Sequence, residues 1–229
     1  MQYKGLLFDK DGTLFDFQKT WGGWVDSSIR HLSEGDAGLA DALADALDFD
    51  MERKLARPGS IVIAGTLGEV AGVMAAVLRT DLRELAMRLD ATAAELVPVP
   101  AAPLAELMTS FRSNNLKLGV ATNDSEAAAI AHLERSGIDH FFDYVAGYDS
   151  GYGGKPGPGM CVAFAERLSL PPEQVVMVGD STHDLQAGRA AGMACVAVLT
   201  GVAGEADLAP YADAVLPDIG HLPNWLAKL

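Results

Sequence analysis

The sequence is poor in cysteine and lacks any long hydrophobic run. Cys161 and Cys195 are the only cysteines in 229 residues. They lie far apart, without the spacing of a metal site, and each sits in an apolar segment, so we expect buried, reduced thiols and a cytoplasmic protein. No apolar run reaches about 18 residues, and the N-terminus has no secretion-signal pattern. A membrane-spanning helix and an exported chain are therefore not expected.

Positive charge is also scarce. The chain has 17 lysines and arginines against 31 aspartates and glutamates, a formal net charge of −14. This balance argues against binding to nucleic acid or to an anionic membrane surface. It also means that an anionic substrate must be met by local cations or by a metal ion. A hydrophobic fraction of 49% is ordinary for a globular protein.

The opening run of the chain combines a buried strand with a pair of carboxylates. Residues 5–8 are apolar and predict a short strand, and the next five residues read Asp-Lys-Asp-Gly-Thr. In a parallel sheet, catalytic groups collect at the carboxyl ends of strands, so Asp9 and Asp11 are a candidate reactive pair. The alternative is a solvated Asp-Gly turn, which two residues alone do not exclude.

Helical periodicity dominates the segment from Gln18 to Val97. An apolar stripe at helical spacing runs through Leu39, Ala42, Leu43, Ala46 and Leu47. The pattern breaks at 57–60, and residues 61–68 predict a loop or a short extended piece. Helical periodicity then resumes, with Thr80 as the predicted N-cap of a later helix. Prolines 98, 100 and 103 form a stiff linker.

The remainder of the chain alternates strands with helices. Strands are predicted at 116–121, 144–146, 175–178, 194–199 and 214–216, and helices at 104–114 and 125–136. This alternation predicts an α/β fold with a mostly parallel sheet. A connection between two parallel strands needs little more than a dozen residues. The additional residues at 18–97 therefore predict an inserted, all-helical domain, which leaves and rejoins the chain beside the reactive loop as a lid over an active site would. Residues 1–17 and 98–229 then form one discontinuous core domain.

Polar side chains follow four of the predicted strands. They are Asp9 and Asp11; Thr122, Asn123 and Asp124; Lys155 in a glycine- and proline-rich loop; and Asp180, Ser181 and Asp184. Each close pair of carboxylates repels by about 4 kcal/mol at 4 Å and an effective dielectric near 20. Lys155 alone cannot neutralise the four carboxylates of Asp9, Asp11, Asp180 and Asp184, so a divalent cation is needed. An all-oxygen set of ligands suits Mg²⁺.

These motifs, in this order and across nearly the whole chain, resemble those of the haloacid dehalogenase superfamily. DKDGT at 9–13 is similar to its first motif, Thr122 in ATN to its second, Lys155 in GGKPGP to its third and GDSTHD at 179–184 to its fourth. The resemblance implies a Rossmann-like three-layer core with a helical cap inserted after the first strand. Within the family, the likeness is to phosphoglycolate phosphatases and related enzymes that act on small phosphate esters.

The resemblance also implies a role for each motif residue. Asp9 would be the nucleophile that forms an aspartyl-phosphate, and Asp11 the general acid and base. Thr122 and Lys155 would hold phosphoryl oxygens. Mg²⁺ would be bound by Asp9, the Asp11 backbone carbonyl and Asp180, with Asp184 either a direct ligand or acting through water. Asp11 favours phosphoryl chemistry, since family members that attack carbon do not need an acid at this position.

Several of these residues have structural alternatives. Ser181 and Asp184 fit a capping box, so Asp184 is a candidate for capping as well as for metal binding. Thr122 alone could cap the next helix, and Asn123 could start that helix, bind substrate or orient a neighbour. Lys155 alone would be a solvated loop lysine. His31, His132, His140, His183 and His221 are expected at surfaces, in loops or at helix ends.

Substrate choice is expected to lie in the cap, where the sequence is least informative. Lys19 and Arg57 are candidate cations for a substrate carboxylate, and Ser60 and Thr66 candidate hydrogen-bonding groups. Lys10 stands where family members often carry an apolar residue and is expected to add a cation at the cleft edge.

The sequence thus predicts a cytoplasmic, Mg²⁺-dependent phosphatase of a small phosphorylated metabolite, acting as a monomer or homodimer. Phosphoglycolate is the leading substrate. The alternatives are a β-phosphoglucomutase-like phosphotransferase and a catalytically silent protein that binds phosphorylated ligands.

Overall fold

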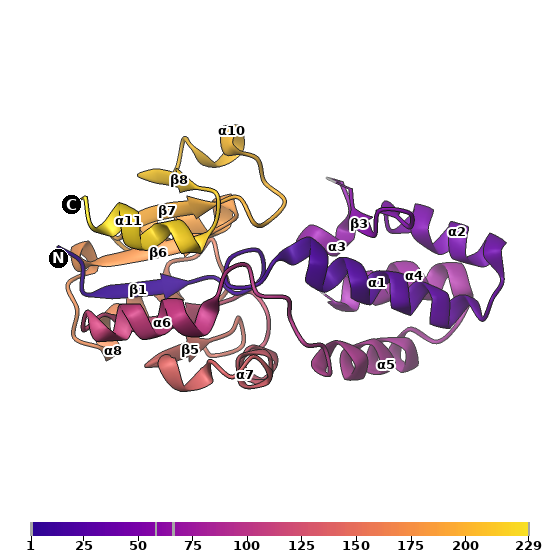
Figure 1. Cartoon of the computed structure of the whole chain (residues 1–229). Helices are drawn as coiled ribbons and strands as arrows, with labels where there is room; N and C mark the ends of the chain where they lie inside the picture. The colour runs from indigo at the N-terminus through magenta and orange to yellow at the C-terminus, as the bar shows by residue number, and fades with distance from the viewer. Residues whose placement is uncertain (1, 58, 66, 229) are drawn as a thin grey trace. The chain divides into compact units, whose positions relative to one another are not determined.

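The chain divides into two compact units, which are described separately. A computed structural model describes residues 2–57, 59–65 and 67–228. One unit comprises the chain up to Phe17 and from Pro98 onward, and the other comprises Gln18–Val97 (Figure 1). The second unit is thus an insertion in the first. No helix of the described residues is long and apolar enough to cross a membrane.

The first unit is built on a six-stranded sheet of order β5-β4-β1-β6-β7-β8. Its strands are β1 (Gly5–Phe8), β4 (Lys117–Ala121), β5 (Tyr144–Ala146), β6 (Val175–Gly179), β7 (Ala194–Val198) and β8 (Ala214–Leu216). Every neighbouring pair in this sheet is parallel. The predicted α/β class is confirmed, and each predicted strand lies within one residue of its observed bounds.

Helices cover both faces of this sheet. They are α6 (Leu104–Ser113), α7 (Glu126–Arg135), α8 (Gly159–Arg167), α9 (Thr182–Ala190), α10 (Glu205–Leu208) and α11 (Leu222–Leu226), with short 3₁₀ turns at Asp139–Phe141, Pro172–Gln174 and Ile219–His221. The three-layer arrangement explains why the strands read as continuous apolar runs, since both faces of each strand are buried.

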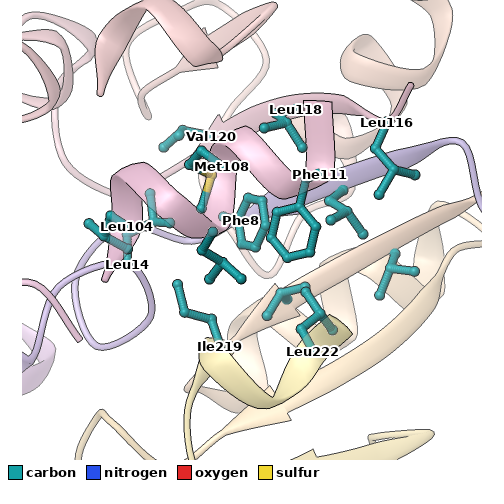
Figure 2. Close-up of a cluster of buried hydrophobic side chains, with 14 of the residues drawn as sticks. Phe8, Leu14, Leu104, Met108, Phe111, Leu116, Leu118, Val120, Ile219 and Leu222 are labelled. Carbon is teal, nitrogen blue, oxygen red and sulfur yellow. The ribbon is translucent and has the colours of Figure 1, made fainter. Parts of the chain in front are cut away.

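Alternate residues of the central strand enter two separate hydrophobic clusters. Phe8 packs with Met108 and Phe111 of α6 and with Leu222 of α11 on one face (Figure 2). Leu7 points to the opposite face, into a cluster supplied by α8 and α9. Both cysteines lie in this second cluster, buried and unbridged as expected. β1 is thereby fixed from both sides, and so is the residue that follows it.

The inserted unit is mainly helical. Its helices are α1 (Phe17–Ser33), α2 (Ala37–Ala46), α3 (Ile61–Ala64), α4 (Leu67–Leu78) and α5 (Leu82–Ala94). They bury a hydrophobic cluster of their own, which includes Trp24, Ile29, Leu43 and Met74. An independent cluster is what a separate folding unit requires.

Three details of this unit differ from the sequence-based expectation. An antiparallel pair, β2 (Phe49–Asp50) and β3 (Leu55–Ala56), interrupts the helices, because two-residue strands are too short to show any periodicity. The predicted loop at 61–68 contains α3 and the start of α4. The N-cap of α5 is Asp81 rather than Thr80, since the Asp81 carboxylate accepts a hydrogen bond from the Glu84 N–H at 2.9 Å.

A partly buried carboxylate fastens the edge strand β5 to its neighbour. Asp143, just before β5, donates its N–H to the Leu118 carbonyl at 2.8 Å and accepts the Leu118 N–H at 3.1 Å. Arg112 of α6 and Lys117 of β4 pair with the same carboxylate. Burial alone would raise the pKa of Asp143, but the hydrogen bond from Leu118 and the two cations outweigh it and lower the pKa.

The opposite edge strand, β8, is fastened in the same way. Asp213 donates its N–H to the Cys195 carbonyl at 2.7 Å and accepts the Cys195 N–H at 2.8 Å. Arg189 of α9 pairs with its carboxylate at 2.7 Å. Each short edge strand is therefore held by an aspartate that bonds the adjacent strand and an arginine from a covering helix.

We expect Asp143→Asn to destabilise the protein in a pH-dependent way. A carboxyl whose pKa is lowered by folding contributes stability above its unfolded pKa, near 3.9, and loses that contribution as the pH falls through its folded pKa. Urea midpoints should show a loss of about 1–2 kcal/mol at pH 7 that shrinks below about pH 4. Asp139→Asn, at an exposed neighbouring position, is the control. A loss that stays constant down to pH 2.5 would contradict this assignment.

Candidate active site

Asp9 lies at the carboxyl end of the central strand. Its N–H donates to the Val178 carbonyl at 2.9 Å, which extends the pairing of β1 with β6 by one residue. The chain then turns back, because the N–H groups of Leu14 and Phe15 both donate to the Lys10 carbonyl, at 3.0 and 3.1 Å. This turn holds the Asp9 carboxylate in a buried position at the carboxyl end of β1.

Lys155 makes three contacts with its buried ammonium group. Its Nζ donates to Asp9 Oδ1 at 2.5 Å and to the Ala121 carbonyl at 2.8 Å, and lies 2.6 Å from Asp184 Oδ1. Burial alone would lower the pKa of Lys155, but the carboxylates of Asp184 and Asp9 outweigh it and raise the pKa. The residue is thus a fixed positive charge, and not a solvated loop lysine.

Three carboxylates converge around this ammonium. Single oxygens of Asp9, Asp180 and Asp184 all lie within 4.8 Å of one another, and all three residues are buried. Burial raises the pKa of Asp9 to about 6, with Lys155 opposing the shift, and raises the pKa of Asp180 well above its usual value. One ammonium against three carboxylates leaves an excess of negative charge at the site.

The composition of this cluster fits a divalent cation. Buried carboxylate oxygens are the ligands preferred by Mg²⁺ and similar hard cations. Two positive charges would balance the excess left by Lys155 and would favour the ionised form of each carboxyl. Among the described residues, the Asp11 side chain is not part of this cluster, and metal binding through its backbone carbonyl stays a prediction.

The two oxygens of Asp184 have separate duties. Oδ2 accepts the Ser181 N–H at 3.0 Å and the Ser181 hydroxyl at 2.6 Å, which completes a capping box at the start of α9. Oδ1 faces Lys155 and the acidic cluster. The capping alternative is therefore confirmed, and it leaves the other oxygen available to the site.

Asp180 fits only because two glycines surround it. A Cβ on Gly12 would lie 2.3 Å from Asp180 Oδ2, and a Cβ on Gly201 would lie 1.7 Å from the same atom. Gly12 also has a positive φ of 83°. Gly201 follows β7 and belongs to none of the four motifs, so sequence reasoning missed it. A glycine shortly after a strand in an α/β fold was the available signal.

Thr122 and Asn123 lie after β4. The Thr122 hydroxyl accepts the Asp124 N–H at 3.1 Å, while Ser125 is the N-cap of α7. The Asn123 side chain donates to the Lys155 carbonyl at 2.9 Å and accepts the Lys155 N–H at 2.8 Å. Capping by Thr122 and a helix-start role for Asn123 are thus wrong. The amide of Asn123 is used to fix the backbone of Lys155, and not to orient Asp9 or Thr122.

Lys10 and His132 lie in an environment that differs from the expected one. Lys10 has no exposed surface and His132 has 1%. Lys10 Nζ pairs with Asp11 and with Asp124 Oδ2, at 3.3 Å for the latter, and contacts His132 Nδ1 at 3.0 Å. Lys10 is therefore not a cation at a cleft edge, and His132 is not a surface histidine.

The candidates in the inserted unit have local partners. Arg57 pairs with Asp48 at 3.3 Å, and both side chains are about half exposed. Ser60 is buried, donates to the Leu47 carbonyl at 2.5 Å and caps α3. These contacts account for Ser60 as a structural residue. Thr66 lies outside the described residues.

Comparisons with known proteins agree with this geometry. The family model for haloacid dehalogenase-like hydrolases matches residues 3–192. A phosphoglycolate phosphatase of Salmonella typhimurium is 31% identical over 206 residues, covering 86% of this chain and 82% of the relative.

Solved structures share the fold. A haloacid dehalogenase family hydrolase of Deinococcus radiodurans, with bound phosphate and sodium, superposes with a TM-score of 0.72 at 21% identity, covering 99% of this chain and 96% of its own. A Thermotoga maritima protein provisionally assigned as a β-phosphoglucomutase has a TM-score of 0.70 at 22% identity, covering 99% of both chains. At such identities the likeness concerns the fold alone.

The family model covers most of the chain, and the Salmonella relative aligns over 82% of its length. The predicted family is therefore confirmed. The chain belongs to the haloacid dehalogenase-like hydrolases, and among curated proteins it is similar to the phosphatases of that family.

Proposed function

We propose that this protein is a Mg²⁺-dependent phosphatase that hydrolyses small phosphate monoesters through an aspartyl-phosphate on Asp9. The observation that carries the proposal is the convergence of Asp9, Asp180 and Asp184 around Lys155. A phosphoryl group brings further negative charge to this site, and phosphoryl transfer depends on alignment and charge neutralisation. The inserted helical unit acts as a cap domain that selects the substrate, and the protein works in the cytoplasm.

Asp9 is the nucleophile. It lies at the end of the central strand, and its position is fixed by the backbone bond to Val178 and by Lys155. Its oxygen attacks phosphorus, the ester oxygen departs, and a phosphoryl group remains on the Asp9 carboxylate. Lys155 keeps the nucleophile ionised and, with Thr122, binds phosphoryl oxygens.

Asp11 is the general acid and base. It donates a proton to the departing ester oxygen and then takes one from the water that attacks the aspartyl-phosphate. Asp11 lies two residues after Asp9 on the turn anchored at the Lys10 carbonyl. This placement puts an acid next to the nucleophile without adding its side chain to the acidic cluster.

Asp9, Asp180, Asp184 and the Asp11 carbonyl would hold the cation. When bound, Mg²⁺ supplies positive charge that neutralises the phosphoryl oxygens and lowers the repulsion between substrate and nucleophile. The protein's own part is to keep three carboxylates buried and close together, with the capping box fixing Asp184 and the glycines fixing Asp180.

Phosphoglycolate is the leading substrate because the similar relatives carry that name. Arg57 and Lys19 are candidates for binding its carboxylate, Arg57 being a half-exposed arginine paired only loosely with Asp48, at 3.3 Å.

The decisive experiment is a screen of phosphorylated metabolites with and without Mg²⁺. The wild-type protein should release inorganic phosphate from phosphoglycolate only when Mg²⁺ is present, and Asp9→Asn should abolish release from every ester. Phosphoryl transfer to a sugar phosphate without release of phosphate would identify a phosphotransferase instead. Near wild-type turnover by Asp9→Asn would refute the nucleophile, and no turnover on the whole panel would favour a ligand-binding protein.

Metal binding can be tested separately from turnover. Mg²⁺ at about 100 times its dissociation constant should stabilise the folded protein by about 2.7 kcal/mol, seen as a rise in Tm. Asp180→Asn should lose most of this rise, because it removes one of three clustered carboxylates. Asp184→Ala should lose the rise and also melt lower without metal, since it removes the oxygen that accepts both Ser181 hydrogen bonds. An undiminished Mg²⁺ effect in Asp180→Asn would exclude this cluster as the site.

The packing around Asp180 predicts a role for Gly201. Gly201→Ala places a methyl group on the Asp180 carboxylate and should displace it, so kcat/KM for 4-nitrophenyl phosphate should fall by about 100-fold. Gly72→Ala, at a helical position of α4 where a Cβ meets nothing within 4 Å, is the control and should retain activity. Equal activities of the two variants would show that the position of Asp180 is unimportant.

A further inference from the structure

A second buried lysine lies next to the nucleophile, and the mechanism above does not use it. Lys10 lies between Asp9 and Asp11 in the sequence, and its side chain is completely buried. Its ammonium has three N–H groups and three acceptors: Asp11 Oδ2, Asp124 Oδ2 at 3.3 Å and His132 Nδ1 at 3.0 Å. Because an ammonium can only donate, His132 Nδ1 must accept and therefore carries no proton.

Burial of this ammonium is difficult to explain by stability alone. Removing a charge from water carries a penalty of several kcal/mol that its partners only partly recover, and apolar residues of similar volume are often as stable. A fully buried ammonium at the carboxyl end of a strand, paired with carboxylates that are only partly buried, therefore suggests a requirement for geometry.

The three acceptors come from separate parts of the fold. Asp11 belongs to the turn after β1, Asp124 to the loop after β4, and His132 to α7. The Asp124 loop is itself well anchored, since the Asp124 carbonyl accepts the Tyr148 N–H at 3.0 Å and Asp124 Oδ1 accepts the Ser125 N–H at 2.9 Å. Lys10 thus ties the Asp11 side chain to the loop after β4 and to α7.

We propose that Lys10 is a positioning residue that orients the carboxyl group of Asp11 for proton transfer, with Asp124 and His132 holding Lys10 in place. Lys10 binds Oδ2, so Oδ1 is the oxygen that passes the proton to and from the reacting oxygens. The inference deepens the proposed function and rests on the acid role that it gives Asp11.

Asp124 has a second purpose in this arrangement. Asp11 gains and loses a proton during each cycle, so it cannot be a constant counter-ion for a buried ammonium. Asp124 lies close enough to keep Lys10 paired throughout. Two carboxylates and a neutral imidazole around one ammonium therefore suit an acid that changes charge better than a single ion pair would.

The test compares leaving groups of similar size and different acidity. 4-Nitrophenol leaves readily without a proton, whereas phenol, with a pKa near that of tyrosine, needs the acid. The ratio of kcat/KM for 4-nitrophenyl phosphate to that for phenyl phosphate should rise about tenfold in Lys10→Met. His132→Ala should raise the ratio in the same direction by a smaller factor. Both substrates are assayed on one preparation, so any loss of folded protein cancels in the ratio.

Matched controls accompany these variants. Lys4→Met removes an exposed lysine just before the same strand, and His140→Ala removes an exposed histidine after α7; neither should change the ratio. Asp11→Asn is the reference and should raise the ratio most. If it leaves the ratio unchanged, the acid role in the proposed function fails. If Asp11→Asn raises the ratio but Lys10→Met and His132→Ala lower both rates equally, Lys10 is only structural and the inference is overturned.

Discussion

The site depends on the excess of negative charge that lies at the carboxyl ends of the parallel strands. Parallel strands bring their carboxyl ends together, so Asp9, Asp180 and Asp184 are buried side by side at a cost that one ammonium cannot remove. Lys155 donates to Asp9 and to the Ala121 carbonyl, and its ammonium lies 2.6 Å from Asp184 Oδ1. A site in this condition attracts a divalent cation, and this requirement links the fold to phosphoryl chemistry.

Much of the surrounding structure keeps the carboxylates from moving apart. The capping box uses one oxygen of Asp184 and thereby aims the other. Asn123 holds both backbone groups of Lys155. Gly12 and Gly201 leave room for Asp180 that any side chain would fill. Each device acts on the backbone or on a second atom of a functional group, so the reactive atoms keep their own bonding capacity.

The sequence predicted the sheet and the motif residues because both are local patterns. A four-residue apolar strand followed by Asp9 is visible without knowledge of its neighbours, and so is the Ser181–Asp184 box. The burial of His132 and the close approach of Gly201 depend on which elements pack together. Nothing in the residues next to His132 distinguishes it from His140, which is exposed. Such features become predictable only once the topology is known.

Two lysines, Lys10 and Lys155, are buried near the carboxyl ends of the strands, although the chain has a net charge of −14. Each of them pairs with a different carboxylate of the candidate site. Lys155 contacts Asp9, the proposed nucleophile, and Lys10 contacts Asp11, the proposed acid. A single cation shared by both carboxylates would have coupled their charges, so that protonating one would alter the other. Each of these two carboxylates pairs with a different ammonium, and Lys10 also pairs with Asp124. This separation suits the proposed roles, in which Asp9 stays ionised while Asp11, two residues away, exchanges a proton.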